Sequence, residues 1–181
     1  TLFRSNRTTI YSLCDNLIFL TWWNNWNKNI VYLNRPRECI EKAFELAELQ
    51  SEINSLENVS NELKKFIHKD YDLAQLVKKG IIYHNGIVPE NVRLYLENII
   101  RKDFSNNIKY VFATSTLLEG VNMPFDNMFI MDTYKGNGNM SFQDLKNLIG
   151  RVNRYSIIFN KNNLDIRKLL PKIHLIKTKD K

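Results

Sequence analysis

The stretch from Ile108 to Pro124, IKYVFATSTLLEGVNMP, constrains the fold of this chain most. It opens with an apolar run of β-branched and aromatic residues that ends at Ala113, and such a run predicts a strand buried on both faces. Three hydroxyl residues follow at the carboxyl end of that strand, Thr114, Ser115 and Thr116. In open α/β sheets this end of the strands faces the ligand crevice. The stretch therefore predicts a parallel α/β sheet with a ligand site after this strand.

The loop after the three hydroxyls also suits a ligand. Gly120 is flexible, and Asn122 carries a short polar side chain, so both permit close approach. Pro124 prevents a simple helical continuation. Hydroxyls, a glycine and an amide gathered on one loop suit the oxygens of phosphate and ribose.

A second stretch, Asn147–Arg154, reads NLIGRVNR and lies near the end of a helix that we expect to begin around Ser141. Arg151 and Arg154 are three residues apart, so they share one helix face. Two guanidinium groups on one face can grip a polyphosphate bidentately, and they stay charged at any ordinary pH. This spacing indicates contact with a polyphosphate.

At this point the chain resembles a known family. VFATSTLLEGVNMP is similar to motif V of the superfamily 2 helicases, particularly their Ski-like branch, and NLIGRVNR is similar to motif VI. Ile30–Asn34 followed by RPRE resembles motif IV. Gly80–Pro89, with Arg93 and Glu97 after it, resembles the segment between motifs IV and V in that branch. The four blocks occur in the family's order.

The resemblance implies a RecA-like, P-loop NTPase type fold with three layers, in which helices flank a mainly parallel sheet. The chain looks like the second, C-terminal lobe of a helicase, which binds ATP against the first lobe and nucleic acid across both. Arg154 would be the arginine finger and Arg151 its partner on the γ-phosphate. The residues implied near the nucleotide are Gly120, Asn122, Asn147 and Gly150. The residues implied on the nucleic-acid backbone are Thr114, Ser115, Thr116, Asn34 and Arg35.

The chain departs from the family at two positions and lacks two motifs. Asn147 stands where the family usually has Gln, and Asn153 stands where it usually has Gly. The sequence contains no GxxxxGK[ST] and no DExH or DEAD box, so it has no phosphate-cradling loop and no Mg²⁺-holding acid. We therefore expect ATP and Mg²⁺ only in a full-length protein, with Mg²⁺ held by a missing N-terminal RecA-like lobe in cis. This chain alone should neither hydrolyse ATP nor unwind a duplex.

Charge and cysteine content support this interpretation without deciding it. The net charge of +7 and the pI near 9.4 favour a polyanionic partner, nucleic acid before membrane. The alternative is a Lys- and Asn-rich bias spread over a solvated surface. Cys14 and Cys39 have no CxxC spacing, so we expect no metal site and a reducing, cytoplasmic location. No segment is apolar over the length that a membrane span needs.

The alternation of strands and helices predicts one domain over residues 30–160, with a linker or N-terminal extension at 1–29 and a C-terminal tail at 161–181. The start at Thr1 suggests a fragment of a longer protein. The expected strands are Ile30–Leu33, Ile81–His84, Ile108–Ala113, Asn127–Asp132, Ser156–Phe159 and Ile173–Ile176. The expected helices are Thr9–Asn25, Pro36–Ile53, Ser60–Lys79 with Gly80 ending it, Pro89–Asp103, one from Ser141, and Leu164–Leu170. Tyr134–Met140 is expected to be a loop.

Several polar and aromatic residues carry a structural interpretation. We expect His84 to hydrogen-bond within a turn, and Arg93 and Glu97 to pair along one helix. Trp22, Trp23 and Trp26 would pack against protein rather than stack on bases.

Two alternative function classes remain open. One is a degenerate lobe that only binds nucleic acid or a partner, against which the Arg151/Arg154 spacing argues. The other is an unrelated α/β fold that binds a small nucleotide. That fold predicts a Gly-rich loop after the first strand, and Leu33–Pro36 contains no glycine.

Overall fold

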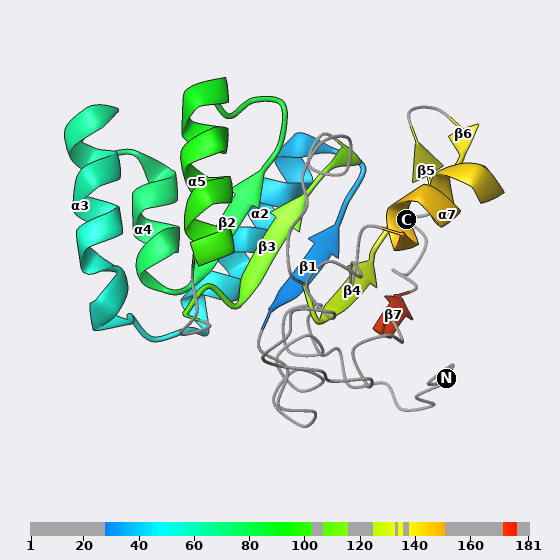
Figure 1. The fold of residues 1–181 in the computed structure, drawn as a ribbon, viewed down its shortest axis with the longest axis horizontal. Helices are drawn as coiled ribbons and strands as arrows, with labels where there is room; N and C mark the ends of the chain where they lie inside the picture. The colour runs from blue at the N-terminus through cyan, green and yellow to red at the C-terminus, as the bar shows by residue number, and fades with distance from the viewer. Residues whose placement is uncertain are drawn as a thin grey trace, which may run out of the picture.

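The central feature of the fold is a five-stranded sheet in which every strand pair is parallel (Figure 1). The computed structural model describes residues 28–102, 107–115, 125–132, 134–135, 138–150 and 172–176. The strand order is β2-β3-β1-β4-β7. The strands are β1 (Asn29–Tyr32), β2 (Ile81–His84), β3 (Tyr110–Ala113), β4 (Asn127–Ile130) and β7 (Lys172–Leu175). The predicted α/β fold with a mainly parallel sheet is confirmed.

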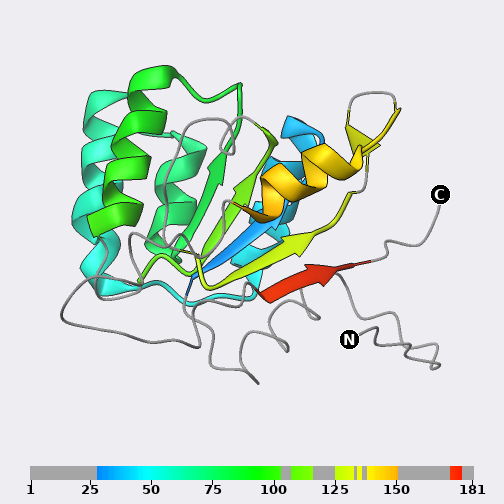
Figure 2. The same cartoon turned by 45° about the vertical axis from the view of Figure 1, so that its right-hand side comes forward.

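Four of these strands are buried along their whole length. Every residue of β1, β2, β3 and β4 is buried, which is the expected state for parallel strands covered on both faces. Strand β7, red in Figure 2, lies at the edge of the sheet. Its residues are half-buried or exposed. It is tied to the sheet by the ring of His174, which stacks on Phe129 of β4 with centroids 4.8 Å apart. The burial predicted for the strand that ends at Ala113 is confirmed by β3.

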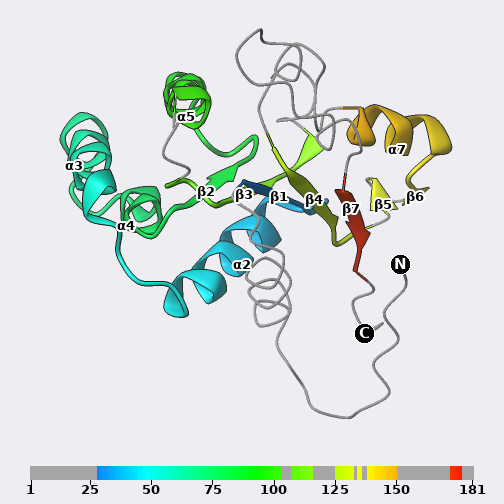
Figure 3. The same cartoon turned by 60° about the horizontal axis from the view of Figure 1, so that its bottom comes forward.

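Helices cover both faces of the sheet and give three layers (Figure 3). Helices α2 (Pro36–Glu48) and α4 (Asp72–Lys78) lie on one face, and α5 (Glu90–Lys102) and α7 (Phe142–Ile149) lie on the other. Helix α3 (Glu57–Phe66) packs beside α4. The arrangement is that of a RecA-like fold. Among the described residues, no helix combines the length and apolar character needed to cross a membrane.

The chain between β1 and β2 differs from the expectation. The helix expected over Pro36–Ile53 ends at Glu48, and the single helix expected over Ser60–Lys79 is two helices, α3 and α4, preceded by the 3₁₀ turn η1 (Asn54–Leu56). A turn at His68 separates them, because its carbonyl accepts from the Tyr71 amide (3.0 Å) and its Nδ1 accepts from the Asp70 amide (3.2 Å). This local bonding competes with helix continuation.

The remaining elements agree closely with the sequence, with one exception. Helix α5 occupies the expected range within a residue, and Ser141 caps α7 through a reciprocal capping box with Asp144. The expected loop at Tyr134–Met140 instead contains a short antiparallel pair, β5 (Tyr134–Lys135) and β6 (Gly138–Asn139). The elements expected before residue 28 and over 156–159 and 164–170 lie outside the described residues, as do the three tryptophans.

Gly80 fixes the entry into β2, as its position after the helix predicted. Its φ is +73°, in the left-handed region, and a Cβ there would lie 2.4 Å from the Asn107 carbonyl oxygen. The Gly80 carbonyl accepts from the amides of Lys109 and Tyr110 (2.9 and 3.1 Å). The glycine therefore allows the segment before β3 to lie directly against the segment before β2.

We predict that Gly80→Ala destabilises the chain strongly. An L-residue in the left-handed region costs about 1–2 kcal/mol, and the clash with backbone adds to that cost. Gly138→Ala is the matched control, because no atom lies within 4 Å of a Cβ at that position, and its effect should stay within about 0.5 kcal/mol. Denaturant unfolding of both variants measures the difference. Equal stabilities would contradict the role assigned to Gly80.

Candidate nucleic-acid interface

The register of the parallel strands places their carboxyl ends side by side. Ala113 at the end of β3 is in register with both Tyr32 of β1 and His84 of β2, and Tyr32 is also in register with Ile130 of β4. Residues that follow these strands therefore lie along one edge of the sheet. The edge comprises Leu33–Arg35 after β1, Asn85 after β2, Thr114–Ser115 after β3 and Met131–Asp132 after β4. The ligand site predicted from the sequence follows β3, which is one of these strands.

Asn34 and Arg35 connect β1 to α2 at this edge. The backbone N–H of Asn34 donates to Asp132 Oδ2 (2.9 Å), and this bond fixes the backbone between β1 and α2. The Arg35 side chain is 75% exposed, and its NH1 atom makes a 3.4 Å ion pair with Glu38 Oε1. Exposed pairs of this kind contribute about 0–1 kcal/mol, so the Arg35 guanidinium is readily available to another anion.

The two described hydroxyls after β3 differ in accessibility. Thr114 is almost fully buried, and its amide donates to the His84 carbonyl (3.3 Å). Ser115 is half-buried. A ligand on this edge would therefore meet Ser115 more readily than Thr114. Thr116, Gly120, Asn122, Arg151 and Arg154 lie outside the described residues, and their roles stay predictions.

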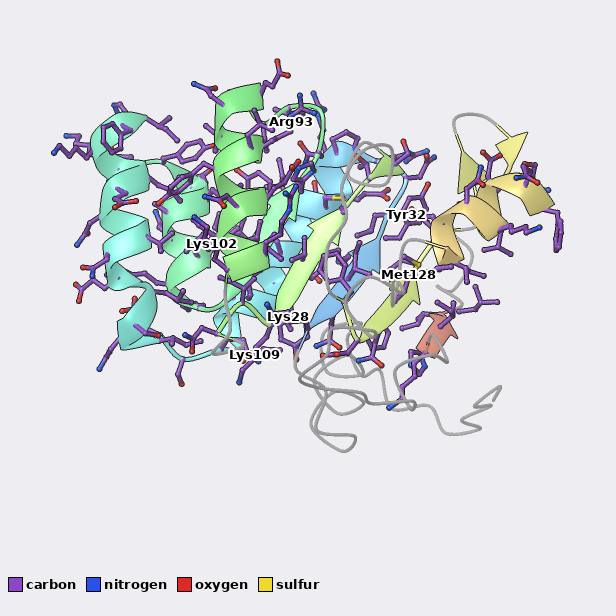
Figure 4. All side chains as sticks on the ribbon, in the orientation of Figure 1. Lys28, Tyr32, Arg93, Lys102, Lys109 and Met128 are labelled. Carbon is purple, nitrogen blue, oxygen red and sulfur yellow. The ribbon has the colours of Figure 1, made fainter. Side chains whose placement is uncertain are left out.

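Helix α7 and its C-cap carry two of the residues that the sequence predicted near the nucleotide. Burial raises the pKa of the Tyr32 phenol, and the charges of Asp132 and of Asp144 on α7 raise it further. Tyr32, labelled in Figure 4, thus lies within the electrostatic influence of a carboxylate of α7. Asn147 is exposed and accepts from Gln143 Nε2 (3.2 Å), and Gly150 is exposed at the C-cap. Both are open to a ligand.

A buried polar pair joins β2 to α5. His84 Nε2 lies 3.0 Å from Glu97 Oε1, and the two residues are 1% and 8% exposed. Glu97 Oε2 also lies 3.6 Å from the NH2 atom of Arg101. Instead of the predicted hydrogen bond within a turn, His84 makes a contact from β2 to Glu97 on α5. Instead of the predicted Arg93–Glu97 pair, Glu97 pairs with Arg101, one turn further along α5. Arg93 Nε is buried without a hydrogen-bond partner among the described residues.

The environment of His84 keeps its imidazole neutral. Burial lowers the pKa of His84 most, and the positive charge of Arg93 lowers it further, while the hydrogen bond and charge of Glu97 oppose that shift. The net pKa lies below the ordinary value of 6.5. As pH falls below that value, an unfolded chain takes up a proton that the folded imidazole does not, so acid favours unfolding.

We predict that the melting temperature falls between pH 7.5 and pH 5.5 and that His84→Gln reduces this fall. Gln can donate to Glu97 but does not titrate. The half-buried His174, whose pKa is also lowered mainly by burial, should account for the part of the fall that remains. Ser51→Gln is the control, because Ser51 is exposed and has no titratable side chain. Identical pH slopes for wild type and His84→Gln would contradict this account.

Sequence reasoning missed two polar residues at the edge. Asn85 is fully buried, and its side chain contacts both its own loop and the loop after β1. Asp132 contacts the same loop from the other side. Their positions in the sequence could have identified them, because each is a polar residue within two positions of the end of a buried strand.

Comparison with known proteins shows distant similarity between this chain and helicases. No family model matches the chain. The chain is 31% identical to the Hachiman protein HamB of Bacillus cereus over 87 residues, which is 48% of this chain and 8% of that protein. It is 24% identical to the ATP-dependent DNA helicase Hel308 of Thermoplasma acidophilum over 69% of the chain and 18% of that helicase. It is 29% identical to the ATP-dependent RNA helicase mtr4 of Schizosaccharomyces pombe over 63% of the chain and 11% of that helicase.

These similarities are distant and partial. The chain spans less than a fifth of the length of each of these three relatives. Both a DNA helicase and an RNA helicase are among them, so they support a helicase-related domain without separating the two substrates. The chain is thus related to helicases over about two thirds of its length.

Proposed function

We propose that this chain is the second RecA-like lobe of an ATP-dependent helicase, of the Ski-like branch, working in the cytoplasm. In this proposal the lobe binds the backbone of single-stranded DNA or RNA along the carboxyl edge of its sheet. It also completes an ATP site formed with a first RecA-like lobe in the same protein. Alone, the chain neither hydrolyses ATP nor unwinds a duplex, because it has no phosphate-cradling loop and no DEAD or DExH box.

One observation supports this function above the others. The in-register ends of β1, β3 and β4 place Asn34–Arg35, Thr114–Ser115 and Asp132 along one edge of a sheet, in a chain that is similar to helicases. Residues that are about 80 positions apart in the sequence thus become neighbours on a single surface. Contacts from an exposed arginine and a half-buried hydroxyl would hold phosphates and give little sequence preference.

The proposed nucleotide role rests on α7 and on the residues after it. Asn147 and Gly150 are exposed at the end of the helix that leads into Arg151 and Arg154. The side-chain amide nitrogen of Asn147 makes no hydrogen bond within the described part of the chain, and it would be available to donate to a phosphate or water. Arg154 would act as an arginine finger, an interaction that contributes about 10³–10⁵ in rate. Mg²⁺ would be held by acids of the other lobe.

A degenerate lobe that only binds nucleic acid is the second candidate. It shares the carboxyl edge with the first proposal and differs only in having no part in ATP hydrolysis. The Arg151/Arg154 spacing favours the motor lobe, since a binding module does not need two arginines on one face beside motif V. Binding and hydrolysis measurements separate the two candidates.

We predict that the chain binds single-stranded oligonucleotides and that Arg35→Ala weakens this binding. Losing one phosphate contact should lower the slope of log K against log salt by about 0.7. Lys109→Ala is the matched control, since Lys109 is exposed immediately before β3, at the opposite edge of the sheet (Figure 4). Fluorescence anisotropy with labelled DNA and RNA at several salt concentrations measures both slopes. Equal losses for the two variants would indicate binding by net charge alone.

We also predict that Arg154→Ala in a longer protein containing the first lobe lowers nucleic-acid-stimulated ATP hydrolysis by about 10³-fold or more. Nucleic-acid binding should be kept, because the substitution leaves the carboxyl edge intact. Single-stranded DNA and RNA are tested in parallel, and the stronger stimulator identifies the substrate. Unchanged hydrolysis would favour the degenerate lobe.

A further inference from the structure

Helix α2 begins at the loop that carries Arg35 and has no side-chain cap at this end. Arg35 is the N-cap residue of α2, with φ −106° and ψ 128°, and no side chain caps the helix there. The Arg35 carbonyl accepts from the Cys39 amide within the helix, and the backbones of its neighbours Asn34 and Pro36 each bond to a side chain distant in sequence. Both contacts come from side chains at the ends of other strands.

Asn85 holds one side of the loop. Its Nδ2 atom donates to the Pro36 carbonyl (3.2 Å), 49 residues away in sequence, and its Oδ1 atom accepts from the Ile87 amide (3.0 Å). Asn85 is fully buried, so both bonds form away from water, where an unmade bond is costly. One side chain therefore joins the loop after β2 to the loop after β1.

Asp132 holds the other side of the loop. Its Oδ2 atom accepts from the Asn34 amide at 2.9 Å, 98 residues away in sequence. A charged acceptor makes this a stronger hydrogen bond than one between neutral groups. The Leu33–Asn34 and Pro36–Arg37 peptides, one residue before and one residue after the two peptides of Arg35, are thus held by residues that follow β4 and β2. The Arg35 side chain itself stays 75% exposed.

We propose that Asn85 and Asp132 are positioning residues that clamp the Asn34–Pro36 loop and so aim Arg35 at the phosphodiester backbone of nucleic acid. A long arginine side chain on an unfixed loop would lose conformational entropy on binding, and the clamp removes the backbone part of that cost. The proposal rests on the nucleic-acid binding proposed above. It adds that affinity depends on two residues that need not touch the ligand.

The decisive comparison is Asp132→Asn with Asp132→Ala. Both variants remove the same negative charge, so both change the electrostatic attraction for phosphate equally. Only the asparagine keeps an oxygen that can accept from the Asn34 amide. We expect Asp132→Ala to bind a labelled single-stranded oligonucleotide about three- to tenfold more weakly than Asp132→Asn, a range typical of coupled neighbours.

The same pair is then measured in an Arg35→Ala background. If the clamp acts through Arg35, the difference between the two Asp132 variants should disappear there. Asn85→Ala, which changes no charge, tests the other half of the clamp in the same two backgrounds. Thermal melts of every variant confirm that the folded chain is being compared, and the Asn85 arm decides the test if Asp132→Ala does not fold.

The outcomes separate this inference from the function on which it rests. A difference that persists undiminished without Arg35, or no difference between the two Asp132 variants, would overturn the clamp while leaving the nucleic-acid interface intact. A wild-type chain that binds neither DNA nor RNA would overturn both proposals. Loss of the difference in the Arg35→Ala background is the result that supports the clamp.

Discussion

The position of β1 is the constraint on which the rest of the structure depends. It pairs with β3 on one side and β4 on the other, in matching register. Because its last residue, Tyr32, is level with the ends of both neighbours, the loops that follow the three strands meet along one edge. A shift of one residue in either ladder would turn the alternating side chains to the opposite face, and a shift in the β1–β4 ladder would also separate Asn34 from Asp132. The proposed interface is therefore a property of strand register as much as of residue type.

Polar groups near this edge favour a defined geometry over maximal stability. A buried pair such as His84 and Glu97 gains little net stability, because desolvation offsets the attraction, although removing one partner is costly. The same holds for Asn85, whose amide forms two bonds that an apolar side chain could not replace. These contacts hold β2, α5 and the loop after β1 in one arrangement. They suit a surface that must present fixed groups to a ligand.

The sequence predicted the sheet and most helix positions because these depend on local patterns. The apolar runs at Ile81–His84 and Tyr110–Ala113 were sufficient to place two buried strands, and Gly80 marked the end of the preceding helix. The break between α3 and α4 was missed, since it depends on hydrogen bonds made by the His68 carbonyl and imidazole rather than on apolar spacing. The contacts of Asn85 and Asp132 were missed for a different reason. They join residues 49 and 98 positions apart, and no local pattern encodes such a pairing.

The order of the strands also has a consequence for how quickly the chain folds. Strand β1 is the first strand described along the sequence, yet it lies in the middle of the sheet. Its amino end bonds to residues 80 and 98 positions later, through Asn29 to Lys109 and Asn127 to Asn29. Loop closure over such distances must precede the contacts that stabilise it, and chains rich in distant contacts fold slowly. Helices α3 and α4, which are adjacent in sequence, can form early. Strand β1 can pair only after β3 and β4, which follow it in the chain, are available.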